Sequence, residues 1–133
     1  MESQFQFTNP ALTNLEFKLN QDFDGREDKE VQIKMGISVE VSKHKSKNEA
    51  IVSLVIELGE KSKKTPFYVK AEETASFKWG ADQEDEMVDS LLQQNAPALL
   101  LSYLRPVIVQ ITAASPYDAY NIPFINFTEQ QEK

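Results

Sequence analysis

The chain has no cysteine, a single histidine and four scattered glycines. Without thiols, disulfide frameworks, thiolate metal sites and a nucleophilic Cys/His pair are excluded. None of the glycines, Gly25, Gly36, Gly59 and Gly80, forms a Gly-rich phosphate loop. The histidine, His44, lies in a lysine-rich segment that is typical of a solvated turn. We therefore expect neither catalysis nor a metal or cofactor site.

Clustered positive charge is also scarce. The chain carries 14 basic and 21 acidic side chains, a net charge of -7. Binding to phosphates requires clustered Lys and Arg, and the two lysine-rich segments, 43–47 and 61–64, are short and lie between strand-like runs. Nucleic acid is therefore not an expected partner. The N-terminus lacks the basic and apolar regions of a secretion signal, so a cytoplasmic protein is predicted.

A long uninterrupted apolar run is missing as well. The segment 95–127 is the most apolar part of the chain, but Pro97, Arg105, Pro106 and Gln110 interrupt it. Because a membrane span needs about 20 predominantly apolar residues, no membrane insertion is expected. The pattern is that of a core helix, with residues on one stripe at i, i+3, i+4 and i+7 spacing. That stripe consists of Leu100, Tyr103, Leu104, Val107, Ile108, Ile111 and Ala114.

The opposite side of this helix is apolar too. Leu99, Leu101 and Val109 lie outside the stripe, and a soluble chain must bury such surface against itself or against another copy. We expect self-association through this side of the helix, with Leu101, Arg105 and Val109 in the interface.

Upstream, three segments alternate apolar and polar residues, the period-2 pattern of half-buried strands: 31–42, 52–58 and 67–79. Short polar connections between them predict antiparallel neighbours. The segment 5–19 alternates in the same way, but Pro10 interrupts it, which predicts a broken edge strand. Glu73 is the only charged member of the apolar row in 67–79.

After Gly80 the pattern becomes helical. Asp82 is the expected N-cap, and Met87, Val88, Leu91 and Leu92 form an apolar stripe. The residues from Asn95 to Pro97 are expected to end this helix and to start the long one. The order predicts one α+β domain, residues 1–133, in which a four-stranded antiparallel sheet is followed by two C-terminal helices packed on one face.

The last third of the chain resembles the SecB export chaperone family. The family carries a proline, a short apolar run, Tyr-x-Arg and an aliphatic helix, and it ends in an Asn-Leu-x-Pro-Val-Asn-Phe-like sequence. The matching elements are Pro97, Leu99 to Leu101, Tyr103, Arg105, Ile108 and Asn121 to Phe127, with the closing proline one place early. Upstream, weaker collinear matches are Phe5 to Phe7, Leu15, Phe17, Leu58 to Glu60, Phe67 and Phe77.

The resemblance implies a SecB-like holdase, a dimer or tetramer that binds unfolded polypeptides in apolar grooves. By position, it implies that Val69, Ala71 and Glu73 lie on the strand face at the subunit interface. The aromatic residues best placed to line a peptide-binding groove are Phe5, Phe67, Phe77 and Trp79. For any single one of these aromatics, the pattern favours an ordinary core position over a groove position.

One departure concerns the translocation motor SecA. In the family, carboxylates help to dock SecA, and the matching positions here are Asn14, Lys18 and Lys70. These replacements argue against SecA docking. The alternative function is therefore an oligomeric interaction or scaffold protein of SecB-like fold that serves one specific protein partner.

Overall fold

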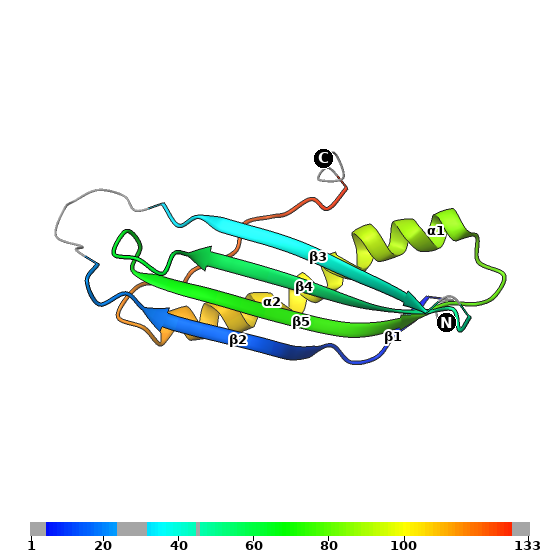
Figure 1. Ribbon diagram of the computed structural model, residues 1–133, viewed down its shortest axis with the longest axis horizontal. Helices are drawn as coiled ribbons and strands as arrows, with labels where there is room; N and C mark the ends of the chain where they lie inside the picture. The colour runs from blue at the N-terminus through cyan, green and yellow to red at the C-terminus, as the bar shows by residue number, and fades with distance from the viewer. Residues whose placement is uncertain (1–4, 24–31, 45, 129–133) are drawn as a thin grey trace.

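The computed structural model describes residues 5–23, 32–44 and 46–128. They form two layers, an antiparallel sheet and a helical segment that lies across one of its faces (Figure 1). The strands are β1 (Gln6–Phe7), β2 (Ala11–Leu19), β3 (Met35–His44), β4 (Glu49–Gly59) and β5 (Phe67–Lys78). The helical elements are α1 (Asp85–Ser90), the π-helix η1 (Leu91–Asn95) and α2 (Ala96–Ala113).

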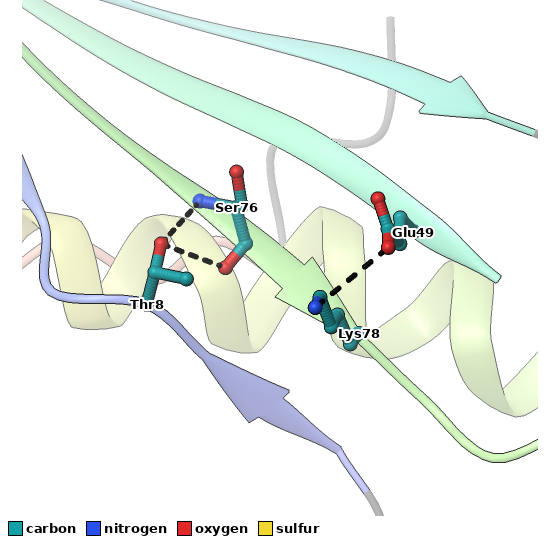
Figure 2. A network of polar contacts seen from close by, with 4 residues as sticks. All are labelled: Thr8, Glu49, Ser76 and Lys78. Atoms are coloured by element: carbon teal, nitrogen blue, oxygen red, sulfur yellow. Dashed lines mark hydrogen bonds and ion pairs between the residues drawn. The ribbon is translucent and has the colours of Figure 1, made fainter. Parts of the chain in front are cut away.

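The strands β3, β4 and β5 form the predicted antiparallel meander, and β1 and β2 both pair with the free edge of β5. The predicted broken edge strand is therefore confirmed, with Pro10 in the break. The sheet has five strands instead of four because the break divides the first strand in two. At the break, the Thr8 hydroxyl accepts a hydrogen bond from the Ser76 amide at 3.2 Å (Figure 2).

Figure 2 also shows an ion pair close to this break. Lys78, the last residue of β5, lies 3.8 Å from Glu49, the first residue of β4. The two residues are directly opposite in the antiparallel register. A cross-strand pair of opposite charge contributes modestly to strand pairing.

The helix-facing side of the sheet forms the core. The apolar row of β4, from Ala50 to Leu58, has exposed fractions of 2% or less. The row of β5 from Phe67 to Phe77 is buried with it, and it includes Glu73. The corresponding residues of β3 are only half-buried, because the helix makes its main sheet contacts with β4 and β5.

The prediction of two separate helices is wrong. One helical segment runs from Asp85 to Ala113, and the π turn η1 joins α1 to α2. Pro97 lies at the start of α2 without ending the segment. In the π turn before it, the Ala96 amide donates to the Leu91 carbonyl five residues back, and this wider turn leaves room for the proline ring, which clashes with the preceding turn of a regular α-helix. The helix begins at Asp85, after Glu84, and not at an Asp82 cap.

By length and composition, residues Asp85–Ala113 would also qualify as a membrane span. In the structure, however, this segment lies against the sheet (Figure 1). Core helices satisfy the same length and hydropathy criteria, so this match is weak evidence for a span.

The buried stripe of α2 is rotated relative to the predicted one. Leu100, Leu104 and Ile108 are fully buried as expected, but Tyr103 is 41% exposed. Leu101, expected on the outer side, is only 4% exposed. The burial follows a spacing of four residues, and Thr112 at 0% exposure extends it.

After α2 the chain folds back along the helix, and we call residues 115–128 the tail. Ile122 and Phe127 of the tail are buried in the core. The Arg105 guanidinium donates hydrogen bonds to the carbonyls of Ile122 and, at 3.0 Å, of Pro123. These contacts fix the tail against α2.

Candidate functional site

An open cavity of about 550 Å³ lies between the edge of the sheet and the helical segment. We call it the groove. Most of the side chains around it are apolar, and they come from β1, the end of β5, the loop before α1, and all three helical elements. Its lining consists of Phe5, Phe7, Phe77, Gln83, Met87, Leu91, Asn95, Ala96 and Leu99.

Aromatic stacking builds the sheet side of the groove. β1 pairs with the end of β5, which places Phe7 directly opposite Phe77. The ring of Phe5 stacks on that of Phe77 with centroids 5.5 Å apart, and on that of Trp79 at 6.3 Å. Such offset aromatic contacts add about 0.5–1.5 kcal/mol beyond the burial of area. Phe7 remains 45% exposed, so this wall presents an aromatic surface to solvent.

The helical side of the groove is formed by Met87, Leu91 and Leu99. Met87 is 54% exposed, whereas its neighbour Val88 is 2% exposed and packs into the core. Sequence reasoning placed both residues on one core stripe and missed the groove role. Adjacent helical residues are about 100° apart, so only one residue of the adjacent pair Met87 and Val88 can face the sheet. This angular spacing could have predicted that Met87 points outward.

Of the four predicted groove aromatics, the structure brings three together. Phe5 and Phe77 line the groove, and Trp79 stacks on Phe5 at its border. Phe67 is 1% exposed and contacts Phe17, with ring centroids 6.0 Å apart. It lies at the opposite end of β5, about 33 Å from Phe77 by the rise of an extended strand. Phe67 is therefore a core residue away from the groove.

The predicted interface residues lie mostly inside the chain. Val69 and Ala71 have 0% exposure and Glu73 and Leu101 have 4%, all between the sheet and the helix. Arg105 and Val109 keep part of their surface exposed, although Arg105 is engaged by the tail. Self-association stays a prediction. Of the predicted interface residues, Arg105 and Val109 are the ones whose side chains remain partly exposed.

Glu73 is electrostatically unusual. Its Oε1 atom is buried and has no hydrogen-bond partner among the described residues. Burial raises the pKa of this carboxyl group above its usual value, because removal from water disfavours the charged form.

A second, more polar cavity of about 400 Å³ lies on the other side of α1. Trp79 and Val88 contribute apolar surface, and the other lining residues are polar or charged. These are Lys43, His44, Asn48, Asp85 and Asp89. Lys43 forms an ion pair with Asp89. Among the residues that the structure describes, no group of three His, Cys, Asp or Glu side chains could hold a metal ion.

The helix-free face of the sheet carries the positions that correspond to SecA docking. Lys70 on β5 stands in register between Glu16 on β2 and Glu57 on β4, and Glu16 pairs with Lys61 at 2.9 Å. Opposite charges therefore alternate across the strands. The Tyr68 hydroxyl donates a 2.6 Å hydrogen bond to Glu57, and this bond, together with burial, raises the Tyr68 pKa to about 12.

The family model described as "Preprotein translocase subunit SecB" matches residues 5–132. This match covers nearly the whole chain, and the protein therefore belongs to the SecB family, as a divergent member. No curated protein matches its sequence.

Solved structures also match this chain. One is the Mycobacterium tuberculosis Rv1957 SecB-like chaperone in complex with a ChAD peptide from the Rv1956 HigA1 antitoxin. It matches with a TM-score of 0.69 at 10% identity, over 92% of this chain and 88% of that chain. Another is a protein of unknown function from Streptococcus agalactiae, with a TM-score of 0.48 at 8% identity, over 90% and 97% of the two chains. The first likeness establishes a SecB-like fold.

Proposed function

We propose that this protein is a SecB-like holdase that binds unfolded polypeptide segments in the groove. The observation that carries the proposal is an open, apolar cavity of about 550 Å³ in a chain of the SecB family. An apolar side chain that is fully covered there would contribute about 1.5–3 kcal/mol. The flexible Met87 side chain can adapt to different residues, which suits a protein with many clients.

The chemistry around the groove favours basic or neutral clients. Glu84, Asp85 and Glu86 immediately precede Met87 and are exposed, and the chain has a net charge of -7. A negative surface accelerates the encounter with positive partners and slows that with negative ones. Capture rates of basic and acidic unfolded clients should therefore differ at low salt and converge at high salt. Equal rates at every salt concentration would count against this preference.

Chaperone activity can be tested by light scattering of an unfolding reporter protein in the presence of this chain. Met87→Ser should weaken the protection because it removes an exposed apolar wall of the groove. Ile51→Ser is the matched control, because Ile51 is 51% exposed and Met87 is 54% exposed, and Ile51 lies outside the groove lining. Unchanged aggregation with excess wild-type protein, or equal loss in both variants, would contradict the proposal.

The expected assembly is a homodimer or homotetramer in the cytoplasm. Several grooves in one assembly would increase avidity for a long unfolded chain, because the second contact becomes intramolecular. Native mass spectrometry would measure the assembly, and a strict monomer would contradict this part of the proposal.

A second candidate function is service to one specific protein partner. It is favoured by the replacement of the SecA-docking carboxylates at Asn14, Lys18 and Lys70, and SecA docking is not expected. The Rv1957 neighbour is bound to an antitoxin peptide, which offers a precedent for such a partner within the fold. A pull-down that recovers one dominant folded protein would favour this alternative, whereas many unfolded clients would favour the general holdase.

A further inference from the structure

Two features that weaken a helix come together where α1 joins α2. The first is the π turn η1, in which the Ala96 amide donates to the Leu91 carbonyl five residues back. The second is Pro97, which follows directly and has no amide proton to donate to the preceding turn. Helices bend mainly at π turns and at prolines, so the junction is a place where the angle between α1 and α2 can change.

The helices on the two sides of this junction differ in how firmly they are attached to the sheet. α2 packs on β4 and β5 with several fully buried side chains, Leu100 and Leu104 among them. α1, the outer end of the helical segment in Figure 1, makes no main contact with a strand, and Val88 is the buried residue among its six described residues. An element with so little buried surface is expected to move more easily than its surroundings.

A single exposed ion pair adds to this attachment. Lys43 on β3 and Asp89 on α1 are 2.5 Å apart, with side chains 36% and 59% exposed. Because such pairs contribute little in water, this contact restrains α1 without fixing it.

There is space for α1 to move, because it separates two cavities. The groove of about 550 Å³ lies on one side, and the polar cavity of about 400 Å³, which the Lys43–Asp89 pair borders, lies on the other. On the groove side, Met87 is 54% exposed, and Phe7 on the facing wall is 45% exposed. A movement of α1 away from β3 would bring these two side chains together and remove apolar surface from water.

We propose that η1 is a hinge and that α1 is a lid of the groove. The lid alternates between the open position of this structure and a closed position in which Met87 covers the groove beside Phe7. The Lys43–Asp89 pair favours the open position, and burial of apolar surface favours the closed one. The effect of the lid on clients rests on the proposed function, whereas the hinge itself does not.

The size of the movement follows from the length of the lid. At a rise of 1.5 Å per residue, Glu86 lies about 15 Å along the helix from Ala96. A change of about 20° at the hinge, the size of an ordinary helix kink, would therefore displace Glu86 by about 5 Å.

Paired spin labels can measure this displacement, because the chain has no cysteine of its own. One pair combines Glu86→Cys on α1 with Ser38→Cys on β3, and both positions are exposed. Pulsed electron paramagnetic resonance on the full chain should give two distances that differ by up to about 5 Å. The control pair combines Ser38→Cys with the exposed Ser102→Cys on α2 and should give one distance. A single distance for both pairs would overturn the proposal.

A proline substitution assigns the movement to η1. Pro97→Ala restores an amide donor at the junction, so the pair with Glu86→Cys should collapse to one distance. Pro106→Ala is the matched control, because Pro106 also lies inside the helix but stands between the fully buried Leu104 and Ile108. This variant should keep both distances. Two distances that persist in Pro97→Ala would show that η1 is not the hinge.

The ion pair provides a test that does not depend on the proline variants. Lys43→Met removes the restraint on α1 and should raise the closed population by about two- to fivefold, as expected for the loss of an exposed pair. Lys78→Met is the matched control, because the partner of Lys78 is Glu49 on β4 and the pair does not involve α1. Equal closed populations in the two variants would overturn the lid.

An unstructured peptide of apolar, uncharged residues separates this inference from the proposed function. A bound peptide should replace Met87 in the groove and shift wild-type protein to the open distance. If two distances are present but no peptide binds, the hinge stands and the holdase proposal fails. If the peptide binds and the populations do not shift, the holdase proposal stands and the lid is overturned.

Discussion

The two ends of the layer between sheet and helix contain similar side chains but differ in how they are covered. At the groove end, Phe5, Phe7 and Phe77 surround an open cavity. At the opposite end, which we call the closed end, Phe67 and Ile122 have 1% and 4% exposure. Both ends have phenylalanines from β5 and from the edge strand, so composition alone does not distinguish them.

Connections of the chain account for the difference. At the closed end, the side-chain amide of Asn20 donates to the carbonyls of Glu60 and Thr65 at 2.7 and 2.9 Å. The backbone amide of Tyr120 donates to the Thr112 hydroxyl at 2.8 Å. At the groove end, β1 pairs with β5 through only two residues. The contrast teaches that an open apolar surface can be made from core residues by leaving out the segments that would cover them.

The largest expected effect comes from truncating an aromatic side chain at each end. Phe67→Ala should destabilise the fold by about 3–5 kcal/mol, because it leaves a cavity in a closed core. Phe7→Ala should cost less than about 1 kcal/mol, since Phe7 is 45% exposed, and should weaken client binding instead. Urea denaturation and the aggregation assay would measure the two effects. Equal destabilisation by both variants would contradict the contrast between the ends.

Replacement of the buried Thr112 hydroxyl tests the hydrogen bond that holds the tail at the closed end. Thr112→Val keeps the shape but removes the acceptor of the Tyr120 amide, so we expect a loss of about 1–3 kcal/mol from the unpaired donor. Thr128→Val is a suitable control, because Thr128 is exposed and its hydroxyl donates to the exposed Asn126 side chain. Urea midpoints that are identical for the two variants would show that this bond does not stabilise the tail.

The sheet could be predicted from the sequence because its signals are local. Strict alternation located the three meander strands, and Pro10 indicated the break in the edge strand. The same alternation identified Glu73 as the charged member of an apolar row, which the structure confirms as buried.

The helical layer and the groove were less predictable because they depend on contacts between elements. The break predicted at Pro97 did not form, since the π turn η1 accommodates the proline. The rotation of α2 that buries Leu101 and exposes Tyr103 is set by packing against β4 and β5. Phe67 and Phe77 have equivalent positions in the strand pattern and are both 1% exposed. They differ in that the groove opens beside Phe77 and not beside Phe67, and this difference depends on the segments around each end.

Glu73 lies between the two ends. The pH dependence of the free energy of unfolding should show how much the burial of its carboxyl group destabilises the fold. Its pKa is raised from 4.5 by burial, so the folded state holds this proton more tightly than the unfolded state. Stability from this group is therefore present below the unfolded pKa and is lost as pH rises through the folded pKa. At neutral pH Glu73→Gln should be more stable by about 1 kcal/mol, a small gain because the amide also lacks a partner. Urea midpoints from pH 4 to pH 8 would measure this, and a constant difference at all pH values would contradict it.

The smallest effect is expected from the ion pair that joins the sheet to the helix near the groove end. Lys43 on β3 pairs with Asp89 on α1, and their side chains are 36% and 59% exposed. Exposed pairs contribute about 0.2–1 kcal/mol and are screened by salt, so Lys43→Met should lower stability only slightly, and not at all in high salt. A double-mutant cycle with Asp89→Asn would isolate the pair. A coupling energy above about 2 kcal/mol would mean that electrostatics, and not the lack of covering segments, determines how α1 is held and hence how wide the groove remains.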